Sequence, residues 1–213
     1  MAAMTAIVIL GCGCSSRPSS DTRPTTEASG LATRSSALSH DSPLASQLLQ
    51  ISDLPGEWQV NPLPIFTDAV TPACLRQALG TFQAANVGFT AADGAAVVEG
   101  LASLGTTART EASFRELEGY FDGCRSVHLQ NPDGTQSPLS GTLARAPFES
   151  VGDQSILWRI VFGDAQLPNA GSAEFVLFRR GSEVGMIGYL GQGSGEVSDI
   201  QPFTQLGIAK VPR

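Results

Sequence analysis

The sequence predicts an α+β domain in which an antiparallel β-sheet carries helices packed on one face. A long helical pattern over residues 107–127 gives way to runs in which apolar residues alternate at a period of two, which is typical of half-buried strands. These runs are separated by short turns, which favour antiparallel pairing. The chain has 213 residues, of which 42% are hydrophobic, so it can bury one sizeable core and a single domain is expected.

The N-terminus predicts an export signal rather than a part of the fold. Residues 1–10 are almost wholly small or apolar and lead into Ile9-Leu10-Gly11-Cys12, which fits the lipobox of bacterial lipoprotein signal peptides. We therefore expect residues 1–11 to be removed and the thiol of Cys12 to carry a lipid anchor with fatty acyl chains, palmitate among them. The apolar run is about half of the ~20 residues that a membrane-spanning helix needs. The alternative is a cytosolic, frayed N-terminus in which Cys12 and Cys14 are incidental.

Residues 12–42 predict a flexible tether between this anchor and the domain. Residues 15–42 contain nine Ser and four Thr and show no apolar periodicity, so they cannot bury enough surface to offset the entropy of ordering them. Positive and negative charges balance in this stretch, so the formal net charge of −7 belongs to the domain at 43–213. That charge argues against a nucleic acid as the partner of the domain.

Two short helices are predicted at the start of the domain. Ser42-Pro43 reads as an N-cap followed by proline at the first helical position, which indicates a helix over 43–52. The same arrangement at Thr71-Pro72 indicates a second helix, which carries Cys74 inward and is closed by Gly80.

The longest helix is expected over 107–127, followed by most of the sheet. Phe114, Leu117, Phe121 and Cys124 fall on one stripe of that helix. Alternating patterns predict the strands, with a hairpin over the turn at 180–182 and a closing helix at the end. The expected strands are 84–91, 95–104, 137–146, 156–162, 174–179 and 184–190, and the closing helix is 199–211.

Cys74 and Cys124 are the two cysteines inside the domain. Both lie on inward faces of predicted helices in a chain expected outside the membrane, where thiols oxidise, so we expect a disulfide between them. A bridge across this loop stabilises by about 4 kcal/mol on the chain-entropy model. Two buried, reduced thiols are the alternative. No cysteine or histidine in the domain lies within ligand spacing of another, so neither a metal nor a cofactor is expected.

The residues predict a domain that is not an enzyme. His128 is the only histidine of the domain, and no G-x-S-x-G nucleophile elbow occurs in the chain. An esterase-like hydrolase is therefore the weaker alternative.

A set of turn and core features runs through residues 45–211. It comprises Leu48-Leu49, Asp53-Leu54-Pro55-Gly56, Trp58, Cys74, Cys124, residues 151–155 before a strand, and Phe178-Arg179-Arg180-Gly181. These features resemble the extracytoplasmic sensor-domain lipoproteins of actinobacteria, which are similar to the extracellular domain of mycobacterial PknH-type serine/threonine kinases. The resemblance implies a curved antiparallel sheet, a groove between sheet and helices, and a sensing or ligand-binding role without catalysis. The kinase domains usually carry two disulfides, whereas this domain has cysteines for one.

The expected function is that of a lipid-anchored module on the outer face of the cell membrane, which binds a small or lipid-like ligand or an envelope protein. Trp58, Trp158, Phe178 and Tyr189 are the residues predicted to line its groove, and a place in the hydrophobic core is the alternative for all four. A structural or host-facing envelope lipoprotein without a pocket is the competing function. A deep apolar groove would separate the two.

Overall fold

The computed structural model describes residues 43–61, 73–130, 136–163, 171–191 and 200–213, with side chains described in these ranges except at 129–130 and 136–139. The predicted signal peptide, Cys12 and the tether lie outside these residues. No helix within the described ranges is long and apolar enough to cross a membrane.

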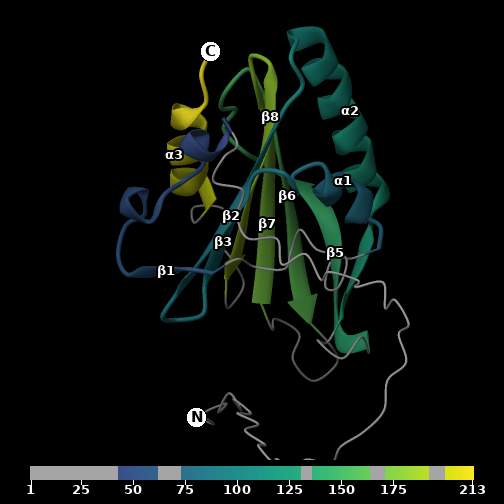
Figure 1. Ribbon diagram of the computed structural model, residues 1–213. Coiled ribbons are helices and arrows are strands. Elements are labelled where there is room, and N and C mark those ends of the chain that lie inside the picture. The colour runs from purple at the N-terminus through teal and green to yellow at the C-terminus, as the bar shows by residue number, and fades with distance from the viewer. Residues whose placement is uncertain (1–42, 62–72, 131–135, 164–170, 192–199) are drawn as a thin grey trace, which may run out of the picture. The chain divides into compact units, whose positions relative to one another are not determined.

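An eight-stranded antiparallel sheet in the order β1-β2-β3-β8-β7-β6-β5-β4 forms the centre of the domain (Figure 1). The predicted α+β class, with an antiparallel sheet in a single domain, is confirmed. The strands are β1 (Trp58–Val60), β2 (Asn86–Ala91), β3 (Ala96–Ser103), β4 (Ser126–Gln130), β5 (Gln136–Ala146), β6 (Gln154–Gly163), β7 (Gly171–Arg180) and β8 (Glu183–Gly191).

Five helical elements accompany the sheet in the described part of the chain. They are the 3-10 helices η1 (Ala45–Gln47) and η2 (Ile51–Asp53) and the α-helices α1 (Arg76–Gly80), α2 (Thr107–Gly123) and α3 (Ile200–Lys210). The Thr106 side chain caps α2 by accepting from the Arg109 backbone N–H at 3.3 Å.

The helix expected over 43–52 is instead two 3-10 turns. Leu48 and Gln50 both adopt extended backbone angles, which interrupt any continuous helix between η1 and η2. The long helix ends at Gly123 rather than at residue 127, because Val127 belongs to β4. The sequence pattern did not predict β1 and β4, which are only three and five residues long.

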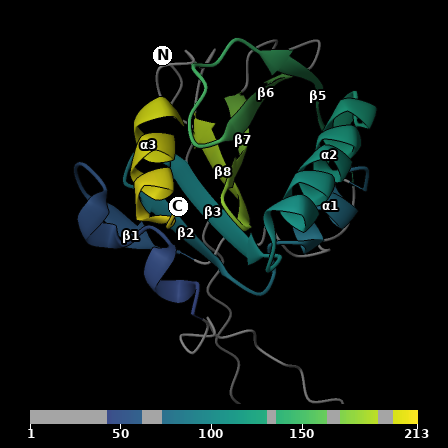
Figure 2. The same cartoon turned by 90° about the horizontal axis from the view of Figure 1, so that it is seen from above.

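Helices cover both faces of the sheet, not one as the sequence predicts. Leu157 and Trp158 are consecutive residues of β6 but belong to two separate hydrophobic clusters. Trp158 packs in the cluster that includes residues of α1 and α2, and Leu157 in the cluster that includes residues of α3 and the segment 48–54. Figure 2 shows α3 on one side of the sheet and α1 with α2 on the other. The central strand β7 is buried at every position from 172 to 178, so both of its faces need a cover.

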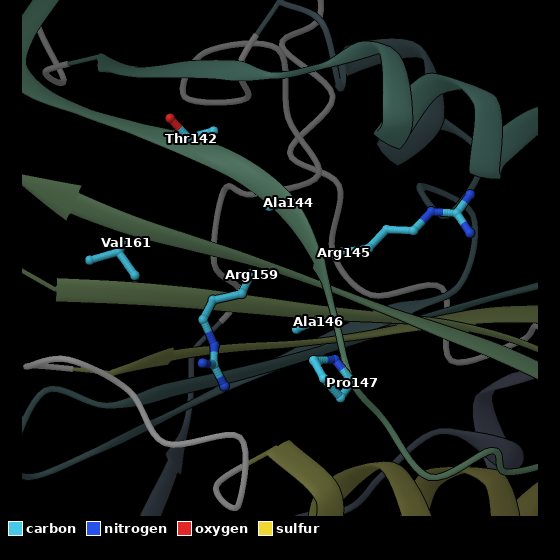
Figure 3. A pocket seen from close by; sticks show the side chains of 7 residues that line it. All are labelled: Thr142, Ala144, Arg145, Ala146, Pro147, Arg159 and Val161. Carbon is cyan, nitrogen blue, oxygen red and sulfur yellow. The ribbon is translucent and has the colours of Figure 1, made fainter.

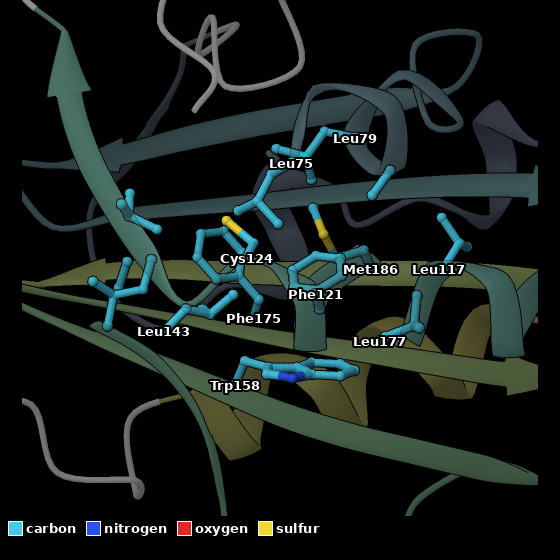
Figure 4. Packing of buried hydrophobic residues seen from close by; sticks show 14 of the residues in the cluster. Leu75, Leu79, Leu117, Phe121, Cys124, Leu143, Trp158, Phe175, Leu177 and Met186 are labelled. Atoms are coloured by element: carbon cyan, nitrogen blue, oxygen red, sulfur yellow. The ribbon is translucent and has the colours of Figure 1, made fainter. Parts of the chain in front are cut away.

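Cys74 and Cys124 form a disulfide, in agreement with the prediction. Their Cα atoms lie 5.3 Å apart, and the bridge joins the residues before α1 to the C-terminal end of α2. Figure 4 shows Cys124 among buried residues from the start of α1, from α2 and from the sheet, including Leu75, which precedes α1, Phe121 and Phe175.

Candidate functional site

Trp158, one of the four aromatic residues predicted to line a groove, lies in the core beneath α2. It is 1% exposed and stacks on Phe121 of α2, with ring centroids 4.8 Å apart (Figure 4). Its indole Nε1 donates to Oδ1 of Asp122 at 3.0 Å, which satisfies the one polar atom of the side chain.

The other three aromatic residues lie on the opposite face of the sheet. Phe178 is fully buried there. Trp58 and Tyr189 are half-buried and flank Phe203 of α3, with ring centroids 5.6 and 5.9 Å from that of Phe203. Trp58 Nε1 also donates to the Pro55 carbonyl at 2.8 Å. The four residues therefore do not come together. Trp58 and Tyr189 form an aromatic cluster with Phe203 of α3, and Phe178 belongs to the same hydrophobic cluster of buried residues.

A shallow hollow of about 470 Å³ lies elsewhere, over strands β5 and β6 (Figure 3). None of the four predicted aromatic residues belongs to its wall. The lining residues are Thr142, Ala144, Arg145, Ala146, Pro147, Arg159 and Val161.

The hollow forms because this part of the sheet face carries short side chains. Thr142 and Ala144 pair with Val161 and Arg159 across the two strands, and Ala146 continues the same face of β5. Helix α3, which covers the same face, packs over β7 and β8. Thr142 and Ala144 are consequently exposed, and Val161 remains 38% exposed.

Arg159 supplies the positive charge of the hollow and is held by an ion pair with Glu174 on the neighbouring strand. Its Nε donates to Glu174 Oε1 at 2.8 Å, and its Nη2 lies 2.6 Å from the same oxygen. The arginine side chain is 24% exposed, whereas that of Glu174 is 1% exposed. The guanidinium thus neutralises a buried carboxylate, while the arginine side chain as a whole remains partly exposed.

Arg145 contributes to the wall of the hollow, but its side chain points away toward α2 (Figure 3). Its Nε donates to Asp122 Oδ1 at 2.8 Å, and its Nη2 bonds Glu118 Oε1 at 2.5 Å. The guanidinium carbon also lies 5.7 Å from the ring centroid of Trp158. The hydrogen bond from Arg145 lowers the pKa of Asp122. Arg145 therefore fastens β5 to α2, and Arg159 is the cation on the side of the hollow.

His128, the histidine that the sequence places in the domain, is exposed on β4. Among the described residues its Nε2 lies 3.4 Å from Ser126 Oγ, within hydrogen-bond distance. In the described ranges no carboxylate orients its ring, and no group of three His, Cys, Asp or Glu side chains is arranged to hold a metal ion. The hollow itself brings together methyl groups, a hydroxyl and a guanidinium, which is a set suited to binding.

The residues around the hollow differ in kind from the large aromatic side chains that the sequence predicts as a groove lining. A usable signal was the alternation of small residues in Thr142-Leu143-Ala144-Arg145-Ala146, where one face of the strand has almost no side-chain volume. A strand face of this kind leaves a hollow wherever no helix covers it.

No protein family and no curated protein matches this chain at a significant level. Among solved structures, it is similar to the extracellular domain of PknH from Mycobacterium tuberculosis, with a TM-score of 0.48 and 13% sequence identity. The alignment covers 77% of this chain and 90% of that one. The similarity is a weak one at the level of the fold.

Proposed function

We propose that the chain is a lipid-anchored lipoprotein of the cell envelope whose domain binds a small or lipid-like ligand without catalysis. The observation that carries this proposal is the hollow over β5 and β6. Its volume of about 470 Å³ falls within the range of small-molecule sites, ~300–1,000 Å³.

The lining favours an amphipathic ligand. Ala144, Ala146 and Val161 offer an apolar floor, and the half-buried side chain of Arg159 lies beside it. An acyl chain or another apolar group would lie over the floor, with a polar or anionic group toward Arg159.

The disulfide supports a place outside the cytoplasm. Cys74 and Cys124 are bridged, and such bonds persist in oxidising compartments. In this proposal Cys12 carries the anchor, the domain faces the outer side of the cell membrane, and an envelope protein is a second class of partner.

A structural envelope lipoprotein without a ligand is the second candidate. The burial of Trp158 and Phe178 favours it, because these two side chains, which the sequence predicts to bind a ligand, pack in the hydrophobic core instead. The hollow is also shallow, so it encloses a ligand on one side only.

Binding of a dansyl-labelled fatty acid separates the two candidates. We expect the purified protein to enhance the fluorescence of this probe, and Ala144→Leu, which fills the hollow, to weaken binding about tenfold, or about 1.4 kcal/mol. Ala112→Leu, at an exposed position of α2, is the matched control and should bind as the parent does. No binding by the parent protein, together with no co-purifying molecule in native mass spectrometry, would favour the structural role. Labelling by a serine-reactive fluorophosphonate would contradict the absence of catalysis.

A further inference from the structure

The carboxyl group of Glu99 lies at the junction of three elements on the α3 face of the sheet. Glu99 is fully buried in β3, and its Oε2 accepts the backbone N–H of Leu49 at 2.5 Å. Its Oε1 makes no hydrogen bond with any of the described residues. A methyl group added at Gly207 of α3 would lie 2.6 Å from Oε1, so that helix packs closely on the other side of the carboxyl.

The segment held by Glu99 spans residues 44–54 and includes η1 and η2. Leu48, Leu49 and Leu54 are its buried side chains, and they pack in the same cluster as Val97 and Leu101 of β3. The N–H of Leu49 therefore brings the middle of the segment directly onto the buried acid.

In the described part of the chain, three other charged groups surround this junction. Asp53 of the segment pairs with Lys210 of α3, Nζ to Oδ2, at 2.5 Å. Lys210 attracts a charge on Glu99 and Asp53 repels it, so Asp53 offsets part of the compensation that Lys210 provides. Glu183 of β8 lies beside Gln47, whose amide nitrogen donates to Glu183 Oε2 at 2.6 Å when it is turned toward that carboxylate.

We propose that residues 44–54 form a proton-linked clasp, which stays on the sheet while Glu99 is a neutral carboxylic acid and lifts away when that acid gives its proton to water. In the closed clasp the Glu99 carboxyl is shielded from water, and in the open clasp it is hydrated. Opening therefore converts the carboxylic acid into a carboxylate and releases one proton to the solvent.

Burial of the Glu99 carboxyl sets the pH range over which the clasp opens. It raises the pKa of Glu99 from 4.5 to about 8, whereas a hydrated glutamate in the open clasp keeps its ordinary pKa. Between these values the closed state holds one more proton than the open state, so the open fraction rises about tenfold per pH unit. The pKa of Asp53 is lowered by its hydrogen bond with Lys210, so Asp53 titrates below this range. Burial also raises the pKa of Glu183, so any exposure of Glu183 acts in the same direction.

The clasp adjoins the stretch that would carry the anchor. The eleven residues of the segment span up to roughly 36–40 Å when fully extended. If the anchor proposed above holds, opening lengthens the link between the membrane and the sheet. The clasp itself does not depend on that anchor or on the ligand.

Hydrogen exchange of peptides from residues 44–54 tests the clasp in the purified protein. After correction for the intrinsic effect of pH, we expect protection of the segment to fall about tenfold per pH unit, and hence ~100-fold from pH 5.5 to 7.5. Protection of β7 should be higher than that of the segment throughout. Protection of the segment that is independent of pH would overturn the proposal, because it would show that opening is not linked to a proton. Protection that is equal in the segment and in β7, with the same pH dependence, would also overturn it, because it would show global unfolding.

Three Glu→Gln variants identify which carboxyl group carries the proton that is linked to opening. Glu99→Gln keeps an acceptor for Leu49 but has no acidic proton, so the protection of its segment should lose most of its dependence on pH. Glu57→Gln, at an exposed position, is the matched control and should retain the parent slope. Glu183→Gln should retain most of that slope. If Glu183→Gln abolishes the slope and Glu99→Gln does not, the proton belongs to Glu183 and the assignment to Glu99 is wrong. If Glu99→Gln fails to fold, the parent protein's exchange profile alone decides whether the clasp exists.

Discussion

Lys210, the only lysine of the chain, is joined to Asp53 across 157 residues of sequence, and this ion pair ties α3 to η2. Both side chains are about three-quarters buried, with exposures of 22% and 27%. The two ends of the described domain therefore meet on one face of the sheet, above Glu99.

Lys210→Met should weaken this connection by about 1 kcal/mol at neutral pH, because the pair is only partly buried. Its hydrogen bond lowers the pKa of Asp53 below 3.8, so the pair stabilises the fold above that pH and the contribution is lost as the pH falls through the lowered value. Urea unfolding at several pH values between 2 and 7 measures the difference. A deficit in the variant that is unchanged at the acidic end would show that Lys210 acts through packing of its aliphatic stem rather than through its charge.

Glu99→Gln should change how global stability depends on pH. The folded state binds the proton of Glu99 more tightly than the unfolded state does, since its pKa is about 8 when folded and close to 4.5 when unfolded. Glu99 therefore makes the free energy of unfolding fall by up to about 1.4 kcal/mol per pH unit as the pH rises from 4.5 to 8. Denaturant titrations across this range should show that this component is missing in Glu99→Gln and present in Glu57→Gln. Equal slopes in the parent and Glu99→Gln would contradict the raised pKa.

Arg159→Met should destabilise the domain by about 3 kcal/mol, because it removes the guanidinium from the buried carboxylate of Glu174. The double variant Arg159→Met with Glu174→Gln should recover most of this loss, since it leaves no buried charge at the pair. Thermal melts of the two single variants and the double variant complete the cycle. Strictly additive effects would show that the two side chains do not interact energetically.

The strong periodicities were sufficient to predict the long elements of this fold. Alternation identified β6 and the hairpin of β7 and β8, and the stripe containing Phe114 and Phe121 identified α2. The faces could not be assigned in the same way, because Leu157 and Trp158 are both apolar and either could have faced a helix. Residues 58–60 are too few to show a period, so β1 depends on its pairing with β2.

The candidate site was harder to predict than the fold, for a physical reason. Large aromatic side chains suit a ligand and a core equally well, and here Trp158 and Phe178 pack in the core. The hollow exists because Ala144 and Ala146 are small and α3 lies over other strands. Sequence alone does not reveal which strands a distant helix covers. The burial of Glu99 is not apparent from the sequence for the same reason, since Leu49, in the segment that covers it, is fifty residues away in the chain.

Replacing both Cys74 and Cys124 by Ser should lower the free energy of unfolding by about 4 kcal/mol, as expected for a bridge that closes a loop of this length. Peptide mapping of the exported, unreduced protein should recover the two cysteines in one linked fragment, and urea unfolding should show the loss of stability. Two free thiols at these positions in the denatured, unreduced protein would contradict the bridge. The parent protein under reducing conditions is the control, and it should unfold at the lower urea concentration of the double variant.

Cys12→Ala should release the protein from membranes without unfolding the domain, because the anchor in our proposal is attached through the thiol of Cys12 alone. Cys14→Ala is the matched control, since it removes a nearby cysteine and leaves the predicted acceptor in place. Fractionation of cells expressing each variant should find the control with the membranes and Cys12→Ala in the soluble fraction, and both should melt at the same temperature. If the lipid alone holds the domain, detergent is needed to extract the parent protein from membranes but not to extract Cys12→Ala. Sedimentation of Cys12→Ala with the membranes would show that another part of the chain attaches the protein. The hollow over β5 and β6 would then be the first surface to test, by adding Ala144→Leu to the Cys12→Ala variant.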